Sequence, residues 1–113
     1  MNDKYDVIVR IRLSAKGAEK STAFGSGSAE LLAGVERLGS LNRAAKEMGM
    51  AYSKAWKSIR ATEEQLGFEL IERKGANGST LTERGAAFLA MYSEMTRKAQ
   101  EAAEETLRKF NAK

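Results

Sequence analysis

The chain has 113 residues, of which 42% are apolar and 30% charged, with a formal net charge of +4. This size fits one small globular domain with a modest core, and the basic balance favours a polyanion as its partner. Because the sequence contains no cysteine and no histidine, disulfides, thiolate or imidazole metal sites and the usual nucleophilic triads are excluded, so we expect neither an enzyme nor a bound cofactor.

The first patterned stretch runs from Tyr5 to Leu13, where apolar and polar residues alternate. A period of two, which only Ile8 interrupts, predicts a strand with one buried face. The polar, glycine-containing segment 14–28 predicts a loop that is anchored through Phe24. A helix is then expected from about Ala29 to Leu38, with Ser28 as its N-cap and Gly39 as its C-terminal stop.

The segment from Gly39 to Ile59 predicts two short helices joined by a tight turn. Ser40 can cap the first helix, and Gly49 can supply the left-handed conformation that ends it. The second helix is expected from Tyr52 to Leu66, closed by Gly67. Small side chains let two helices cross closely, as a helix-turn-helix requires. The residues expected to face inward are Leu41, Ala44, Ala45 and Met48 in the first helix, and Ala55, Trp56, Ile59 and Leu66 in the second.

The charges on the second helix favour a nucleic-acid contact. No acidic residue occurs from position 48 to position 62, while Lys54, Lys57 and Arg60 recur three apart on one face. A recognition helix meets base edges and phosphates at its start and outer side. Two core helices without nucleic acid are the alternative. The predicted DNA contacts here are Ser40, Tyr52, Ser53, Lys54, Lys57, Ser58 and Arg60, and the footprint is expected to be bounded by Glu63, Glu64, Glu69 and Glu72.

The segment 68–82 predicts a hairpin of two short strands, or wing, around the dipeptide Asn77-Gly78, which suits a type I′ turn. Arg73, Lys74 and Asn77 lie at or near its tip, where a wing meets the DNA backbone or minor groove. An ordinary solvent-exposed tip is the alternative. Trp56 is expected to be a core or rim anchor rather than a platform for base stacking.

The last third predicts one long helix from Glu83 to about Phe110, with Thr82 as its cap. Its apolar stripe follows spacings of four and three through Phe88, Tyr92, Met95, Ala99 and Ala102 and then shifts to Ala103, Leu107 and Phe110. The proximal half of the helix can pack on the rest of the chain. The later residues lie too far along for one small core, so a second subunit is expected to cover them; a frayed charged tail is the alternative. The predicted dimer interface consists of Ala99, Ala103, Leu107 and Phe110.

Two sequence patterns carry a family resemblance. The pairing of GSL…AAK.MGM with AYSKAW, and LxERxxxxGSxLTxxG from Leu70 to Gly85, resemble the N-terminal domain of molybdate-responsive regulators of the ModE type. LysR-type winged helices are similar more distantly. The resemblance implies a transcription regulator that binds operator DNA as a homodimer, with Tyr52, Ser53, Lys54 and Lys57 in the recognition helix. The wing is shorter and poorer in glycine than in that family.

Full-length members of the ModE type carry further C-terminal domains that bind molybdate, and nothing after Phe110 in this sequence could form one. We therefore do not expect this chain to bind molybdate. No apolar run is long enough to span a membrane, and the start MNDKYDVIV lacks a secretory apolar region, so no membrane contact and a cytoplasmic location are expected.

The sequence as a whole predicts a mainly α fold with a small β wing. This is a winged helix-turn-helix over residues 1–82, with an N-terminal strand, followed by a long dimerisation helix over 83–113 in the same compact unit. The expected function is sequence-specific regulation of transcription by a dimer on an inverted-repeat operator, with molybdate- or oxyanion-related genes as the implied targets. A winged helix whose basic face binds an acidic protein is the alternative.

Overall fold

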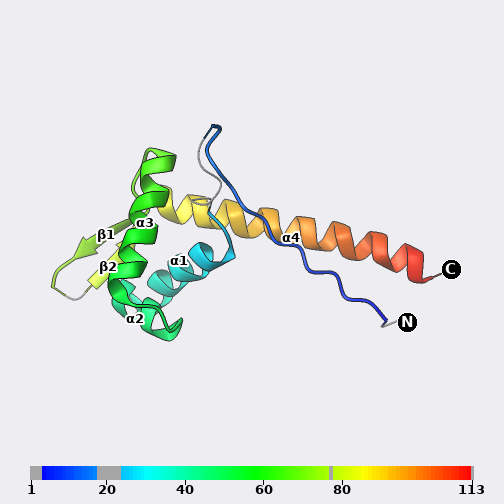
Figure 1. Cartoon of the computed structure of the whole chain (residues 1–113), viewed down its shortest axis with the longest axis horizontal. Coiled ribbons are helices and arrows are strands. Elements are labelled where there is room, and N and C mark those ends of the chain that lie inside the picture. Colours follow the sequence, from blue (N-terminus) through cyan, green and yellow to red (C-terminus); the bar gives the residue numbers. More distant parts are fainter. Residues whose placement is uncertain (1–3, 18–23, 77, 113) are drawn as a thin grey trace.

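The computed structural model describes residues 4–17, 24–76 and 78–112. The elements follow in the order α1 (Ser26–Leu38), α2 (Leu41–Glu47), α3 (Tyr52–Leu66), β1 (Ile71–Lys74), β2 (Gly78–Leu81) and α4 (Glu83–Asn111) (Figure 1). The predicted architecture is confirmed, because three short helices and a two-stranded antiparallel hairpin form one body, from which the distal part of α4 projects. Over the described ranges, no helix combines the length and the apolar character needed to cross a membrane.

The core lies where α1, α2, α3 and the hairpin meet the proximal part of α4. Its largest fully buried side chains include Leu31, Leu32, Leu41 and Ile59. Phe24 is also fully buried, and its ring packs edge-on against Phe88 and Tyr92 of α4, with ring centroids 4.9 and 5.1 Å apart. The predicted anchor at Phe24 is therefore confirmed. Edge-to-face aromatic pairs of this kind fix α4 onto the body.

Helices α1 and α2 cross closely at two small residues. Ala44 and Ala45 are buried, as the sequence predicts, and Ala44 faces Gly34 of α1. A Cβ added at Gly34 would lie 2.8 Å from the Cβ of Ala44, so a glycine is needed here for the close approach. At the helix ends, Arg37 and Glu47 pair at 2.6 Å, and this hydrogen bond with the attraction between the charges lowers the pKa of Glu47.

The helix caps and stops follow the sequence except at the start of α1. The hydroxyl of Ser40 accepts a hydrogen bond from the N–H of Arg43 (3.1 Å), and that of Thr82 accepts one from Gly85 (2.8 Å). Gly39 ends α1 in the left-handed conformation, as predicted. The prediction of Ser28 as the cap of α1 is wrong, because the chain turns into the helix directly after Phe24, with Gly25 as N-cap.

The N-terminal segment is extended, but it is not the predicted strand of a sheet. Its one β-bridge joins Leu13 to Phe24. The alternation is real, since Val7, Val9, Ile11 and Leu13 are half-buried whereas residues 6, 8, 10 and 12 are exposed. Side chains of α4 take the place of a neighbouring strand: the Tyr92 hydroxyl donates to the Ile11 carbonyl (2.7 Å), and Gln100 bonds Val7 and Val9.

The wing differs from the prediction in its turn. Ile71 pairs with Leu81 and Lys74 with Gly78, so Gly78 belongs to β2 and the chain reverses between Lys74 and Gly78. A two-residue Asn-Gly turn is therefore wrong. Gly75, with φ 69°, takes the left-handed position that lets the strands reverse. Asn77, a predicted DNA contact, lies outside the described residues.

Candidate nucleic-acid interface

The N-terminal half of α3 carries most of the predicted contacts on its outer face. Ala55, Trp56 and Ile59 are buried, and this turns Ser53, Lys54 and Lys57 outward, where they are exposed. Tyr52, at the start of the helix, is 40% exposed. The first turn holds no acidic residue, and no side chain caps it. Because the N-terminus of a helix carries a partial positive charge, this end of α3 favours an anion.

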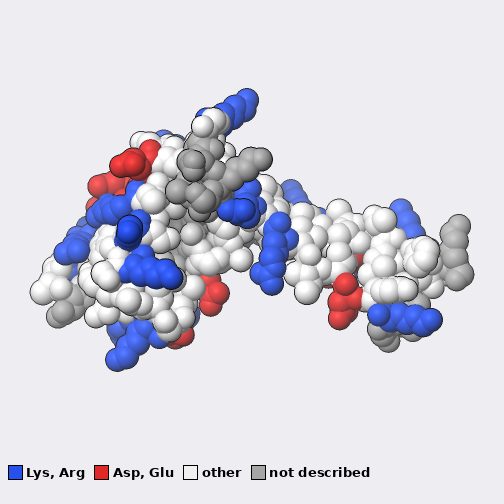
Figure 2. Space-filling view, in the orientation of Figure 1, with Lys and Arg blue, Asp and Glu red and all other residues white. Residues whose placement is uncertain are grey.

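The surface charges are distributed as the sequence suggests, with basic groups over α2, α3 and the wing. Figure 2 shows Lys and Arg side chains on the body, with one group of acidic side chains at the upper left and others at its lower edge. Ser58 is half-buried, whereas Lys54 and Lys57 are exposed, and the Ser58 carbonyl accepts a hydrogen bond from the Thr62 hydroxyl (3.1 Å). Ser58 is thus less available to DNA than Lys54 and Lys57.

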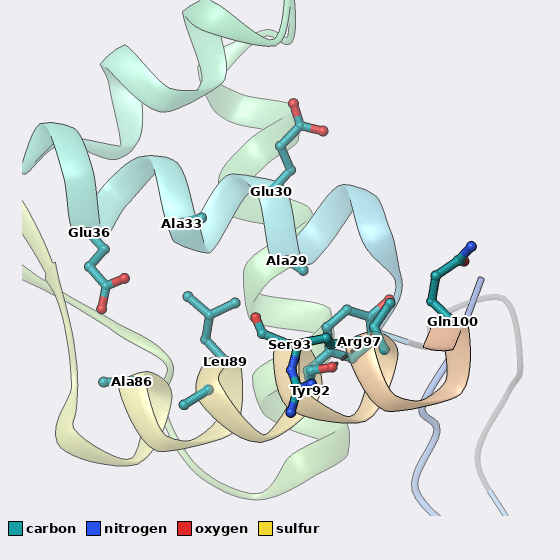
Figure 3. Close-up of a pocket in the computed structure, with 12 residues that line it drawn as sticks. Ala29, Glu30, Ala33, Glu36, Ala86, Leu89, Tyr92, Ser93, Arg97 and Gln100 are labelled. Atoms are coloured by element: carbon teal, nitrogen blue, oxygen red, sulfur yellow. Dashed lines mark hydrogen bonds between the residues drawn. The ribbon is translucent and has the colours of Figure 1, made fainter. Parts of the chain in front are cut away.

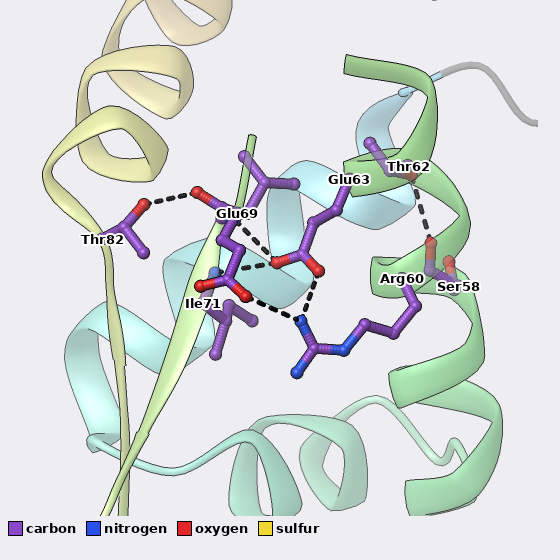
Figure 4. A network of polar contacts seen from close by, with 8 residues as sticks. Ser58, Arg60, Thr62, Glu63, Glu69, Ile71 and Thr82 are labelled. Carbon is purple, nitrogen blue, oxygen red and sulfur yellow. Dashed lines mark hydrogen bonds and ion pairs between the residues drawn. The ribbon is translucent and has the colours of Figure 1, made fainter. Parts of the chain in front are cut away.

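The C-terminal half of α3 holds a polar network that the sequence interpretation missed (Figure 4). Glu63 is buried, and its carboxylate accepts hydrogen bonds from the N–H groups of Leu70 (2.7 Å) and Ile71 (3.2 Å). Arg60 pairs with the same carboxylate at 2.5 Å, and with Glu69 at 3.9 Å. Glu63 therefore fastens the wing to α3. The sequence interpretation placed Glu63 at the surface as a residue that repels phosphates, and the structure contradicts this because Glu63 is buried.

Trp56 connects α3 to the wing from the inside. The guanidinium groups of Arg60 and Arg73 lie over its ring, 4.4 and 4.9 Å from the centroid, and Tyr52 packs edge-on at 6.4 Å. The ring is 9% exposed. This confirms Trp56 as an anchor rather than a stacking platform. Cation–π attraction at a desolvated ring holds a guanidinium in place, so Arg73 is positioned by α3 although it belongs to β1.

A polar hollow of about 300 Å³ lies where the start of α2, the start of α3 and the wing meet. Tyr52 and Arg73, both predicted contacts, line it. Arg43 and Asn42 also line it, and the sequence interpretation missed both. Their position in the first turn of a helix capped by Ser40 was the available signal. Ser40 lines the hollow too, but it is buried and its hydroxyl caps α2. Its contact with DNA stays a prediction.

The remaining predicted site residues do not line this hollow. Lys74 is exposed near the wing tip, 3.6 Å from the carboxylate of Glu72. The four residues predicted for the dimer interface lie on the distal part of α4. Of these, Ala99, Ala103 and Leu107 are half-buried, and Phe110 is 68% exposed. Ala102, which the sequence places in the apolar stripe of the long helix, is exposed.

This arrangement of a capped α2, an exposed α3 and a hairpin defines a winged helix-turn-helix domain. The family model described as "Bacterial regulatory helix-turn-helix protein, lysR family" matches residues 28–86, which is more than half of the chain. The chain therefore belongs to the LysR family of bacterial regulatory helix-turn-helix proteins.

Similar proteins of known sequence or structure agree with this assignment. The molybdenum-pterin-binding protein MopB of Rhodobacter capsulatus is 33% identical over 66 residues, which are 55% of this chain and 24% of that protein. The crystal structure of ArgP from Mycobacterium tuberculosis is 26% identical with a TM-score of 0.55, covering 70% of this chain and 29% of ArgP. The chain thus spans under a third of either protein's length. The DNA-binding domain of CbnR, crystallised with DNA, is 28% identical with a TM-score of 0.54, covering 76% and 93% of the two chains.

Proposed function

We propose that this chain is a sequence-specific DNA-binding transcription regulator in which α3 enters the major groove. The observation that carries the proposal is the outer face of α3, where Lys54 and Lys57 are exposed at the positive end of the helix with no acidic residue in its first turn. The similarity to a CbnR domain that was crystallised with DNA supports it.

The contacts divide by chemistry. Lys54, Lys57 and Ser53 extend from the recognition face toward base edges or phosphates. The hollow between α2, α3 and the wing presents Arg43 and Arg73 to one phosphate of the backbone, because guanidinium groups donate charge-assisted hydrogen bonds to phosphate oxygens. Arg60 acts through Trp56 and Glu63 and positions the wing.

We further propose that the protein acts as a homodimer through α4. A groove of about 650 Å³ runs between α1 and α4, and its lining includes the apolar side chains of Ala29, Ala33 and Leu89 as well as charged side chains such as Glu36 and Arg97 (Figure 3). This groove and the uncovered Phe110 give α4 apolar surface along its length. A two-fold pairing would turn two recognition helices to one side of the duplex and select an inverted repeat.

The regulated genes that we favour concern molybdate or a related oxyanion. Support comes from the residues that resemble the ModE type and from the 33% identity with a molybdenum-pterin-binding protein. Mapping the bound sites across the genome tests this, and binding sites that lie away from genes of oxyanion uptake or use would contradict it.

The proposed DNA contact is tested with Lys57→Ala. If the ammonium group reaches a base edge, operator binding weakens by about 1–3 kcal/mol. If it touches only a phosphate, the loss is similar for all sequences, and the dependence of log K on log salt falls by about 0.9. Titrations by fluorescence anisotropy at several salt concentrations distinguish the two.

Lys98→Ala is the matched control, because Lys98 is also an exposed lysine, on α4, and its loss changes the net charge by the same amount. Equal effects of Lys57→Ala and Lys98→Ala would contradict a recognition role for α3. A wild-type protein without salt-dependent affinity for duplex DNA would favour a module that binds an acidic protein.

A further inference from the structure

The N-terminal segment has one edge that is held by the body. In an extended chain, the N–H and C=O groups of alternate residues point to the same edge. On one edge these groups bond side chains of α4. Gln100 donates to the Val7 carbonyl (2.6 Å) and accepts from the Val9 N–H (2.9 Å), and the Tyr92 hydroxyl donates to the Ile11 carbonyl. At Leu13 the same edge pairs with Phe24.

The opposite edge carries the backbone groups of Asp6, Ile8 and Arg10. Within the described ranges, these groups make no hydrogen bond with the rest of the chain. The Ile8 side chain is 74% exposed, although isoleucine favours a paired strand. An open edge with exposed apolar side chains is a template for pairing with another strand. Figure 1 shows the segment on the outside of the molecule, beside α4.

We propose that this edge pairs in antiparallel fashion with the same edge of a second copy, with Ile8 opposite Ile8 of the partner subunit. The sequence is self-complementary in this register, because Asp6 then faces Arg10 of the partner subunit and the reverse pair forms by symmetry. Opposite charges across an antiparallel pair stabilise it, and like charges destabilise it. A register centred on Asp6 or on Arg10 would place like charges opposite each other.

The parity of the strand agrees with this register. Residues 6, 8 and 10 are those whose backbone groups point outward, and in this register they pair only with one another. The other face of the ribbon then matches Val7 with Val9 of the partner subunit, on the side that is half-buried against α4. The pairing adds a contact outside residues 28–86, which the family model covers.

This inference uses the homodimer of the proposed function but no DNA contact. Its test is a disulfide, since the sequence contains no cysteine. Directly opposed residues of a hydrogen-bonded antiparallel pair have Cα atoms about 5.5 Å apart, within the range that a disulfide bridges. We therefore expect Ile8→Cys to form a covalent dimer under mild oxidation, without DNA.

Arg10→Cys is the matched control. In the proposed register, position 10 of one subunit and position 10 of the partner subunit are offset by four residues, or roughly 13 Å along the strand, which a disulfide cannot span. Mixing Asp6→Cys with Arg10→Cys should restore linkage, and only between the two different variants. The proposal would be overturned if Ile8→Cys formed covalent dimers no faster than Arg10→Cys. It would also be overturned if Ile8→Cys, Arg10→Cys and the mixture of Asp6→Cys with Arg10→Cys all formed them equally.

A charge exchange gives an independent test through the dimer dissociation constant, measured by sedimentation. Asp6→Arg and Arg10→Asp should each weaken the dimer by about tenfold, because each places two like-charge pairs across the ribbon. The double variant should return to the wild-type value. A wild-type dimer that none of these changes affects would overturn the strand pairing and leave dimerisation through α4 standing, whereas a wild-type monomer would overturn both.

Discussion

At the scale of single residues, Glu63 is the side chain that most changes the interpretation of the charge pattern. It lies in a run that in sequence marks the acidic border of a basic helix. In the structure its carboxylate satisfies two backbone N–H groups at the start of the wing and neutralises Arg60. Buried donors left without partners cost folding free energy, so Glu63 sets the position of β1 relative to α3.

Replacing this carboxylate should destabilise the fold. We expect Glu63→Gln to lower the free energy of unfolding by about 1.5–3 kcal/mol, because hydrogen bonds to a charged acceptor are lost or weakened. Urea denaturation followed by circular dichroism measures the change. Glu64→Gln is the control, since Glu64 is the exposed neighbour and should stay near the wild-type value. Equal stability of both variants would show that the network in Figure 4 contributes nothing.

At the scale of elements, the crossing of α1 and α2 sets how closely the helix-turn-helix packs. Gly34→Ala should cost about 1–3 kcal/mol, because the added methyl group overlaps Ala44 and the helices must separate. Gly27→Ala is a matched control in the same helix, where a Cβ meets open space; it should be neutral or stabilising by up to about 1 kcal/mol.

A double variant sharpens this prediction. Ala44→Gly removes the opposing methyl group, so combining it with Gly34→Ala should recover more stability than the sum of the two single changes predicts. Thermal unfolding of the four proteins measures the coupling. Additive effects would mean that Gly34 is required for a reason other than the crossing.

The elements also show what the sequence can and cannot predict. Ser40, Thr82 and Gly39 were predicted correctly as caps or stops, because these roles depend on hydrogen bonds and dihedral angles within one turn. The prediction of an N-terminal strand is correct for its buried face, which the alternation indicates. The alternation cannot tell whether a neighbouring strand or the side chains of Gln100 and Tyr92 form hydrogen bonds with its backbone.

The site was predictable to a similar extent. The outward position of Lys54 and Lys57 follows from helical periodicity alone, and the structure confirms it. The inner role of Glu63 and the place of Arg43 beside the wing depend on contacts between elements. The predicted turn of the wing is wrong, because the dipeptide Asn-Gly favours a two-residue turn locally, whereas the register of β1 and β2 places Gly78 in the strand.

At the scale of the whole molecule, α4 gives the protein its elongated form, with extents of 58 × 32 × 23 Å. Its distal residues extend past the body (Figure 1). The division into residues 1–82 and 83–113 stays a prediction. Leu107 and Phe110 are the side chains there with most apolar area to bury, so a dimer through α4 should depend on them.

Replacing both Leu107 and Phe110 with Asp should release monomers, because the proposed dimer interface on α4 would then bury unpaired charges. Affinity for an inverted repeat should then fall far more than affinity for random DNA, since the two half-sites are no longer linked. Light scattering and gel-shift titration measure the two effects. Thr106→Asp with Lys109→Ala changes the net charge equally at exposed positions of the same turn, and it should remain dimeric. A wild-type monomer at micromolar concentration would exclude α4 as the interface.

The position of Trp56 has a spectroscopic consequence. It is the one tryptophan of the sequence, and its ring contacts Arg60 of its own helix and Arg73 of the wing. The tryptophan emission of the protein therefore has a single source, located between the two elements proposed to contact the duplex. If Arg73 leaves the ring to reach a phosphate, the emission must change in step with wing engagement. An unlabelled protein would then report in real time whether the wing docks together with α3 or after it.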